Sequence, residues 1–405
     1  MSGRGPLAGI TVVSVEQAVS APMCTRTLAD FGARVIKVEN PRSGDFARHY
    51  DDVVHGLAAH FVWANRGKES IALDLKASRG SEVLHRLLDD ADVFVSNLAP
   101  GSMAAMGFGP DDLATRHPDL FVMEIDGYGP GGPLSAKRAY DLLVQAESGI
   151  CSVTGTADAP AKPGPPVADV CSGLYAALTV LAALCGRRSP DPGAGPPATS
   201  GSVSLFDTAA ELMGYALTYT RHTGVDQEPL GMSSPAVSPY GAYATADGHT
   251  VVLGTTNDAE WRRLARDVID RPDLADDARY ARNADRVRLR ADLDAVIEAW
   301  CATRDLVTIQ SSADAAGIGN SRYNTPSEVI AHPHLQARDR WRPIDTPAGT
   351  VTALLPPPVI AGHEMAMGAV PGLGEHTDAV LAGAGFTSTE IAGLRAEGVV
   401  GAADR

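Results

Sequence analysis

The feature that most constrains the fold is an alternation of short apolar runs and helical segments over the first 126 residues. Runs rich in Val, Ile and Leu occupy residues 10–15, 34–39, 70–75, 93–98 and 120–125. The segments before the second and fourth runs have apolar residues at helical spacing, and Gly32 ends the first of these segments. Strands and helices alternating at this spacing predict βαβ units. We therefore expect an α/β fold with a mostly parallel sheet and helices on its faces.

The rest of the chain predicts a second, smaller unit. Helices are expected at 141–148 and from Asp169 onward, the latter apolar on every side and therefore buried all round. Hairpin spacing around Asp247-Gly248 and charged helical stretches then mark a change near residue 225. A last amphipathic helix should begin near Thr387. The expected division is a large Rossmann-like domain at 1–205, a linker at 206–224, a small α+β domain at 225–325, and a return linker with the C-terminal part of the large domain at 326–405.

Composition excludes several classes of protein. The chain has 405 residues and a net charge of −15, which argues against a nucleic-acid binder. Its five cysteines form no C-x-x-C pair, so we expect reduced thiols and a cytoplasmic protein. The N-terminus lacks an apolar secretory segment, and the most apolar window, 174–184, is too short for a membrane span. The eleven histidines are scattered, so no metal site is expected.

Two motifs have competing interpretations. Residues 127–132, GYGPGG, match G-x-G-x-x-G after a strand, but Pro133 follows and the segment reads as a turn rather than the start of a helix. We interpret it as a glycine-rich loop at the carboxyl end of a strand, where ligands bind in open α/β sheets. Asp169 stands at the front of an apolar helix. It could be an N-cap or an ionised nucleophile for an acyl group, and pattern alone does not decide between these roles.

Seven segments, taken together and in order, resemble the family III CoA-transferases, the group of formyl-CoA transferase, the carnitine CoA-transferases and α-methylacyl-CoA racemase. The resemblance extends from Pro6 to about Val400. The segments are residues 9–48, 65–76, 92–108, 127–133, 138–155, 168–184 and 373–391.

The resemblance implies a fold and a mechanism. It implies a Rossmann-like domain built from the N-terminal half and the C-terminal tail, a small domain between them, and a homodimer of two interlocked rings. It implies coenzyme A as co-substrate, with no tightly bound cofactor. An aspartate at the place of Asp169 would attack the acyl-CoA thioester and form a mixed anhydride and free CoA thiolate. The thiolate would then attack this anhydride, or one exchanged with the acceptor acid, and an aspartyl-CoA thioester can form.

The resemblance also implies roles for other residues. Tyr140 would contact the acyl group, and the glycine loop, with Gly129 and Gly131, would supply N–H donors to the oxyanion. Residues expected to bind CoA are Ala18, Val19, Arg42, Leu73, Leu75, Lys76, Asn97, Leu98, Met106 and Arg138. The sequence departs from the oxalate-pathway transferase at Val19, where that enzyme has glutamine, and at Asn40, Ala105 and Asp126, where it has basic residues.

A transferase is favoured over the alternative, a 2-methylacyl-CoA racemase. The racemases need a histidine where this chain has Tyr140, and a tyrosine with an ordinary pKa near 10 is a poor base at pH 7. The N-terminal segments resemble most closely the branch that moves CoA between small dicarboxylates, such as succinyl-CoA to citramalate, malate or itaconate, or within mesaconyl-CoA. A second substrate carboxylate needs a cation, for which Arg48 or His49, and otherwise Arg66, are candidates.

Overall fold

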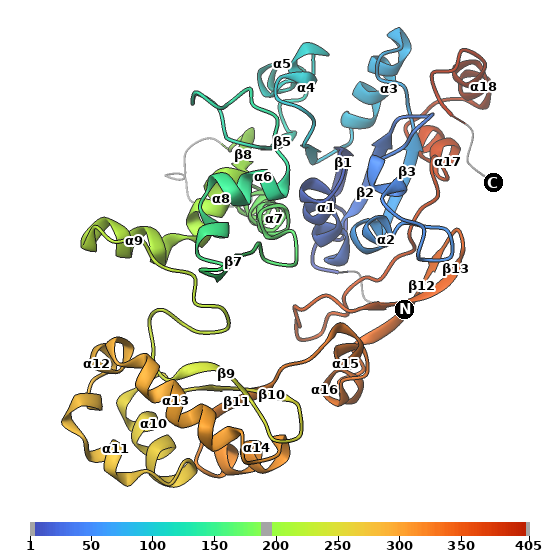
Figure 1. The fold of residues 1–405 in the computed structure, drawn as a ribbon. Helices are drawn as coiled ribbons and strands as arrows, with labels where there is room; N and C mark the ends of the chain where they lie inside the picture. Colours follow the sequence, from blue (N-terminus) through green and yellow to red (C-terminus); the bar gives the residue numbers. More distant parts are fainter. Residues whose placement is uncertain (1–4, 188–196, 402–405) are drawn as a thin grey trace. The chain divides into compact units, whose positions relative to one another are not determined.

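The computed structural model of this protein describes residues 5–187 and 197–401, and the chain divides into two compact units. The large unit comprises Met1–Gly149, Pro163–Gly214 and Arg338–Arg405. The small unit comprises Ile150–Lys162 and Tyr215–Ala337. Figure 1 shows both units with their helices and strands labelled.

A six-stranded parallel sheet forms the centre of the large unit. Its order is β3-β2-β1-β4-β5-β8, and every neighbouring pair is parallel. The chain runs outward from β1 in one direction and then outward from β4 in the other, so the order reverses between these two strands. Ligands in open α/β sheets bind outside the carboxyl ends of the strands at such a point. The strands are β1 (Thr11–Val15), β2 (Arg34–Glu39), β3 (Lys68–Ala72), β4 (Val93–Ser96), β5 (Phe121–Asp126) and β8 (Ser200–Ser204).

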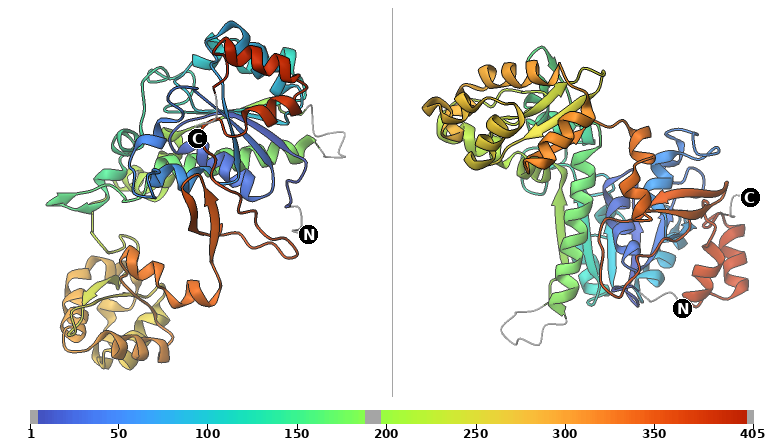
Figure 2. Two further views of the ribbon diagram at one scale, coloured as in Figure 1. Left: turned by 90° about the vertical axis from the view of Figure 1, so that its right-hand side faces the viewer. Right: turned by 90° about the horizontal axis from the view of Figure 1, so that it is seen from below.

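Helices cover both faces of this sheet. On one face α1 (Ser20–Asp30) packs against α7 (Val167–Arg187), which also contacts β5 (Figure 2). On the other face α3 (Ser78–Leu88) packs its leucines against alternate side chains of the sheet, such as Val13 and Ile36. The remaining helices of this part of the chain are α2 (Ala59–Asn65), α4 (Ser102–Ala105), α5 (Pro110–Arg116), α6 (Asp141–Glu147), α8 (Leu205–Leu212) and the 3₁₀ turn η1 (Phe46–His49).

The contact between α1 and α7 depends on Gly173. A Cβ at this position would lie 2.4 Å from the Ser20 carbonyl oxygen and 2.9 Å from the Met23 Cβ. Glycine therefore lets the two helix backbones approach closely. Because Gly173 stands one helical turn after Asp169, the contact brings the start of α1 beside Asp169.

The prediction that α7 is buried all round is wrong for the single chain. Ala176, Ala177 and Val180 are buried against the unit, whereas Leu174 and Leu178 are 42% and 60% exposed. Among the described residues, α7 is the one helix long and apolar enough to suit a membrane, but length and composition alone are weak evidence, because soluble core helices pass the same test.

The C-terminal segment returns to the large unit. The hairpin of β12 (Trp341–Thr346) and β13 (Gly349–Leu354) is followed by α17 (Thr377–Gly383) and α18 (Ser388–Ala396). Leu381 and Leu394 from these two helices join the core on the α3 face of the sheet. The helix expected near Thr387 is confirmed, since Thr387 is the N-cap of α18 and forms a capping box with Glu390.

The small unit is an α+β unit with its own core. Its antiparallel sheet has the order β11-β10-β9, and the predicted hairpin around Asp247-Gly248 joins β9 to β10. Trp261 and Ile297 are fully buried in the helices that cover this sheet. The strands are β6 (Gly155–Thr156), β7 (Ala159–Pro160), β9 (Tyr240–Ala244), β10 (Thr250–Gly254) and β11 (Gly319–Arg322). The helices are α9 (Gly214–Thr223), α10 (Asp258–Arg263), α11 (Pro272–Asp276), α12 (Asn283–Arg288), α13 (Arg290–Cys301), α14 (Leu306–Ala315), α15 (Pro326–Ile330), α16 (Pro333–Ala337), η2 (Ile150–Ser152), the π-helix η3 (Leu264–Val268) and η4 (Ala278–Tyr280).

The boundaries differ from those expected from the sequence. The segment expected to be a linker, 206–224, is almost entirely helical and forms α8 and α9. Residues 150–162 belong to the small unit, because Gly155 accepts a backbone hydrogen bond from Gly231 and Thr156 pairs with Leu230. The amino-acid composition of so short a segment does not indicate that it belongs to the small unit.

Candidate active site

Three adjoining cavities follow the carboxyl ends of the parallel strands in the large unit. A central cavity of about 350 Å³ lies at the reversal between β1 and β4. A second cavity, of about 260 Å³, lies over β1, β2 and the residues after β3. A third, of about 360 Å³, lies beside the glycine loop 127–132. Leu98, just after β4, contributes to the walls of all three, so the cavities adjoin one another, and together they are called the groove.

Asp169 lies in the wall of the central cavity together with Tyr140 and Ser20. Its carboxyl group is half-buried in the first turn of α7. Burial and the nearby Asp141 carboxylate raise the pKa of Asp169 to about 7, although a hydrogen bond from the Ser20 side chain acts in the opposite direction. About half of the Asp169 side chains are therefore ionised at neutral pH.

Asp169 does not cap α7, which corrects the N-cap interpretation. The helix begins at Val167, two residues earlier. Asp141, the first residue of α6, takes the capping role: its Oδ1 accepts the N–H groups of Ala168 at 3.0 Å and Asp169 at 3.2 Å. The expectation that the helix terminus keeps Asp169 ionised is also wrong, because burial and the neighbouring negative charge raise its pKa.

The turn between β1 and α1 also lines the central cavity. Ala18 has φ = +63°, in the left-handed region that non-glycine residues rarely adopt. The side-chain oxygen of Asn97 accepts the backbone N–H of Gln17 at 2.9 Å. The side-chain nitrogen of Asn97 donates to the Gln17 carbonyl oxygen at 2.8 Å and to the Ser20 hydroxyl at 3.1 Å. The polar atoms of Asn97 are thus committed to this turn, although the sequence suggested a CoA contact.

The structure brings most of the expected site residues to the groove. Ala18, Asn97, Leu98, Arg138, Tyr140 and Asp169 line the central cavity. Leu73, Leu75, Lys76 and Met106 line the second cavity, and Gly129 and Gly131 line the third. Val19 is buried and lines none of the three.

The prediction that Gly129 donates to an oxyanion is contradicted. Its N–H already donates to the Asp126 carboxylate at 2.6 Å. Gly131 lies in the third cavity rather than beside Asp169. The loop does form a turn, as predicted, with positive φ at both glycines.

The basic residues proposed to bind a substrate carboxylate lie outside the groove. Arg48 forms a bidentate ion pair with Glu39, with both N···O distances at 2.8 Å, and its guanidinium stacks over Phe61 at 3.7 Å. Arg66 is buried and bonded to Asp30. His49 is exposed, with its Nε2 3.0 Å from the carbonyl oxygen of Ser43. These three side chains have structural partners in place of a ligand.

Two cations do belong to the central cavity, Lys137 and Arg138. Lys137 pairs with Glu147 at 2.8 Å, whereas Arg138 is exposed and takes part in no ion pair among the described residues. Arg42, the other expected phosphate contact, is 85% exposed and lies 3.9 Å from Asp74, outside the three cavities.

Sequence reasoning missed Gln17, Ser20, Phe46 and Lys137 in the wall of the central cavity. Gln17 and Ser20 flank two residues that were selected, and Lys137 precedes Arg138. These residues could therefore have been found from their position next to a strand end or a selected residue, but not from their residue type. Phe46 reaches the cavity through the 3₁₀ turn after β2, which no sequence pattern places there.

Comparison with known proteins identifies the family. Residues 7–377 match the CoA-transferase family III profile. The chain is 33% identical to the succinate–glutarate CoA-transferase of Agrobacterium fabrum, over 94% of this chain and 96% of that protein. It is 31% identical to the succinyl-CoA–D-citramalate CoA-transferase of Chloroflexus aurantiacus, over 82% of each chain.

Solved structures agree with the sequence comparison. A CaiB/BaiF family protein from Brucella suis has a TM-score of 0.78 at 30% identity, covering 94% of this chain and all of that one. Rv3272 from Mycobacterium tuberculosis has a TM-score of 0.81 at 30% identity, covering 92% of this chain and 98% of that one. The parallel sheet, the strand-end groove and these matches lead to one conclusion: the chain belongs to the family III CoA-transferases and is an enzyme.

Proposed function

We propose that this CoA-transferase moves CoA from an acyl-CoA donor to a small dicarboxylic acid through a covalent intermediate on Asp169. The observation that carries the proposal is the position of Asp169: a half-buried carboxylate, with a pKa raised to about 7, in the wall of a groove at the strand carboxyl ends. A carboxylate of this basicity is a stronger nucleophile than an ordinary aspartate and is still ionised in about half of the molecules at pH 7.

In the first step an Asp169 carboxylate oxygen attacks the thioester carbonyl carbon. The C–S bond breaks, CoA leaves as the thiolate, and a neutral mixed anhydride remains on Asp169. The thiolate then attacks the Asp169 carbonyl, forming an aspartyl-CoA thioester and releasing the donor acid. The acceptor carboxylate attacks this thioester, which breaks its C–S bond, expels the CoA thiolate and forms a second mixed anhydride. The thiolate finally attacks the acceptor's acyl carbon in this anhydride, which forms the new acyl-CoA and frees the Asp169 carboxylate. Formation of the neutral anhydride relieves the repulsion between Asp169 and Asp141.

The structure suggests donors for the oxyanions. Ser20 is the first residue of α1 and lines the central cavity, and no side chain caps this helix. The backbone N–H groups of Ser20 and Ala21 are therefore our candidates, in place of Gly129, because Pro22 has no N–H and the Ser20 hydroxyl already donates to Asp169. Tyr140 lies in the same wall and is assigned to the acyl group.

The groove offers a path for the CoA tail. The second cavity, with Leu73, Leu75 and Lys76, is assigned to the adenine nucleotide, and Arg138 to a phosphate. The relatives are named for succinate, glutarate and citramalate, which supports a dicarboxylate here. Lys137 and Arg138 are the two cations of the central cavity. With Arg138 assigned to a phosphate, Lys137 is our candidate for the second carboxylate, which would replace its surface partner Glu147.

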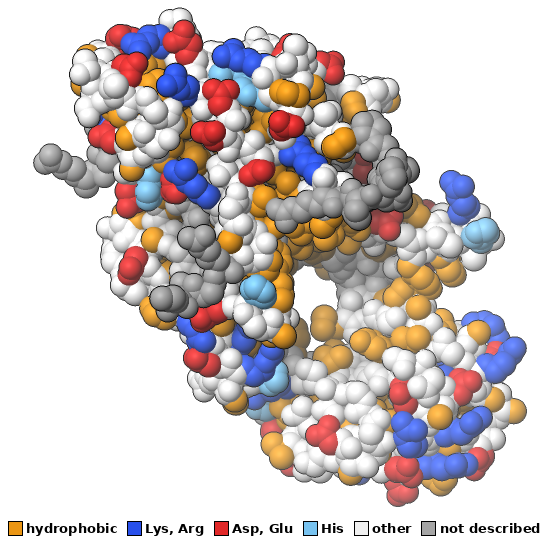
Figure 3. All heavy atoms as spheres, turned by 180° about the vertical axis from the view of Figure 1, so that it is seen from behind, with side chains coloured by type: hydrophobic (Ala, Val, Ile, Leu, Met, Phe, Trp, Pro, Cys, Tyr) orange, Lys and Arg blue, Asp and Glu red, His pale blue; other side chains and the backbone are white. Residues whose placement is uncertain are grey.

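We infer that the enzyme is a cytoplasmic homodimer. All five cysteines are free thiols. Apolar side chains of α6, α7 and α8 are 42–60% exposed on the large unit, and Figure 3 shows hydrophobic side chains gathered at its surface. These side chains are Leu142, Leu143, Leu174, Tyr175, Leu178 and Leu212. A second copy would cover them. Light scattering should give twice 42.2 kDa, and a monomer at micromolar concentration would contradict this inference.

Substitution of Asp169 tests the nucleophile. Asp169→Ala and Asp169→Asn should abolish CoA transfer from succinyl-CoA to a panel of dicarboxylates while CoA still binds in calorimetry. Asp111→Ala, at an exposed carboxylate of α5, is the matched control and should retain turnover. Full activity without the Asp169 carboxylate would refute the proposal. Rapid entry of solvent deuterium at the α-carbon of a 2-methylacyl-CoA would favour the racemase instead.

A further inference from the structure

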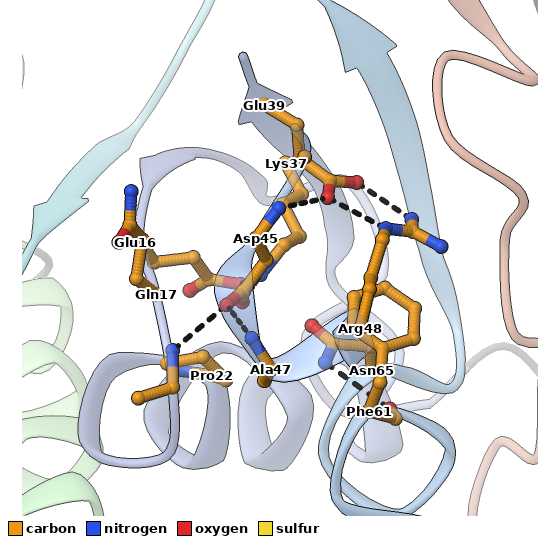
Figure 4. A network of polar contacts seen from close by, with 12 residues as sticks. Glu16, Gln17, Pro22, Lys37, Glu39, Asp45, Ala47, Arg48, Phe61 and Asn65 are labelled. Atoms are coloured by element: carbon orange, nitrogen blue, oxygen red, sulfur yellow. Dashed lines mark hydrogen bonds and ion pairs between the residues drawn. The ribbon is translucent and has the colours of Figure 1, made fainter. Parts of the chain in front are cut away.

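A network of buried charges lies directly behind the turn that faces Asp169. Glu16, Lys37, Asp45 and Lys68 are each at most 3% exposed. Lys37 Nζ lies 2.7 Å from Asp45 and 3.4 Å from Glu16, and Lys68 Nζ lies 2.7 Å from Glu16. Figure 4 shows Glu16, Lys37 and Asp45 converging on one another, with Arg48 and Glu39 at one side. Neither the family comparison nor the proposed reaction assigns a role to this network.

Stability of the fold is a poor explanation for such a network. Buried ion pairs cost about as much in lost hydration as they return, and apolar residues of similar volume often replace them without loss. Lys37 lies within β2, an interior strand of the sheet, where its neighbours Ile36 and Val38 are apolar core residues. A structural role in holding one particular backbone conformation is the better-attested use of buried charges.

Asp45 connects the network to the active-site turn. Its Oδ1 accepts the N–H of Ala18 at 3.0 Å and that of Ala47 at 2.9 Å, while its Oδ2 is bound by Lys37. Ala18 is the residue with φ = +63°, an unfavourable conformation for alanine. Asn97 holds Gln17 from the other side of the turn. The strained conformation is therefore maintained by hydrogen bonds on both flanks.

The conformation of this turn decides where α1 begins. Ser20 follows Ala18 by two residues, hydrogen-bonds to Asp169 and presents the uncapped start of α1 to the cavity. A change at Ala18 would shift Ser20 and the first-turn N–H groups relative to the reacting carboxylate. We propose that Asp45 is a positioning residue for acyl transfer: through Ala18 it fixes the start of α1 against Asp169. This inference rests on the proposed role of Asp169.

The test compares Asp45→Ala with a suppressor at the turn. Glycine adopts positive φ without the cost that alanine bears, so Ala18→Gly should let the turn form without its Asp45 hydrogen bond. With succinyl-CoA as donor, the release of CoA thiol in a single turnover reports the acylation rate. Asp45→Ala should slow this rate about 100-fold, the effect of displacing a reacting group by about 1 Å. The double variant Asp45→Ala with Ala18→Gly should acylate about tenfold faster than Asp45→Ala alone.

Two further controls separate positioning from general damage. Because Asp45 also lines the second cavity, the acylation rate is measured at saturating succinyl-CoA, so that a change in CoA affinity does not contribute to it. Asp30→Ala is the matched control: Asp30 is also a buried carboxylate paired with an arginine, Arg66, but it does not contact the turn. It should lower the melting temperature by a similar amount and leave the acylation rate within about threefold of the parent enzyme.

Asp45→Asn provides an independent check that does not require Asp45→Ala to fold. The asparagine keeps an oxygen acceptor for the Ala18 N–H but removes the nearer of the two charge partners of Lys37, which retains Glu16 at 3.4 Å. This variant should therefore be less stable than the parent enzyme but acylate at a similar rate. A folded Asp45→Asn enzyme that is 100-fold slow would overturn the inference. An Asp45→Ala rate no lower than that of Asp30→Ala, or a double variant no faster than Asp45→Ala, would do so too. Retained activity in Asp169→Ala would instead overturn the proposed nucleophile.

Discussion

The position of Asp169 should cost the protein stability, and replacing it should return that stability. Burial and Asp141 raise the pKa of Asp169 from 3.8 to about 7. The folded protein therefore retains a proton between these two pH values that the unfolded chain releases. Stability falls as pH rises through this window, and the full cost is present above pH 7. A shift of about 3 units corresponds to about 4 kcal/mol as an upper limit.

Asp169→Asn removes this cost because the amide has nearly the same shape and no charge. Since the Asp169 carboxyl is half-buried, solvent screening reduces the effect, and we expect the free energy of unfolding to rise by about 1–3 kcal/mol at pH 8. At pH 4 or below the two proteins should be equally stable, because the native carboxyl is then protonated. The same variant should be inactive, so stability and activity move in opposite directions.

Thermal or urea unfolding at pH 8 and pH 4, at fixed protein concentration, measures this difference. The control is Asp52→Asn, the same change at an exposed carboxylate, which should alter stability by less than about 0.5 kcal/mol at either pH. If Asp169→Asn were no more stable than the parent protein at pH 8, or stabilised it equally at both pH values, the description of Asp169 as a destabilised carboxylate would be wrong.

Three other predictions concern activity and acid stability. The single-turnover acylation rate should fall about tenfold per pH unit below pH 7, as Asp169 is protonated, and a rate independent of pH from 5 to 8 would contradict the pKa of about 7. Although burial opposes it, Arg48 and Lys37 hold the pKa of Glu39 at about 2, against 4.5 in an unfolded chain. The stability from Glu39 is therefore present above pH 4.5 and lost as pH falls toward 2, and Glu39→Gln should flatten acid unfolding curves in that range. Gly173→Ala should destabilise the protein by about 1–3 kcal/mol in urea unfolding, since its Cβ would press on the Ser20 carbonyl; unchanged stability would show that α1 and α7 can separate freely.

The sheet could be predicted because its signal is local. Each apolar run between residues 10 and 125 became a parallel strand within a few residues of its predicted bounds, since such runs suit strands buried on both faces. The hairpin at Asp247-Gly248 and the cap at Thr387 likewise depend on neighbours in the sequence. The strand order, and with it the reversal between β1 and β4, depends on which strands pair, and the sequence pattern predicted only a mostly parallel sheet with ligands at the strand carboxyl ends.

The details of the site depend on contacts between distant residues. Nothing near Asp169 in the sequence indicates that Asp141, 28 positions earlier, caps the helix. Arg48 looked free for a substrate because Glu39, its partner, precedes it by nine residues across a turn. The raised pKa of Asp169 arises from burial, which a one-dimensional pattern does not contain. Residue types were therefore easier to select than the roles they play.

Trapping the acylated residue tests the central claim most directly. The enzyme would be mixed with succinyl-CoA, treated with hydroxylamine or borohydride, digested and mapped by mass spectrometry. Our account predicts a donor-dependent modification of the side chain at position 169 and none in Asp169→Asn treated in the same way. Continued turnover in an enzyme whose Asp169 peptide stays unmodified throughout would contradict it.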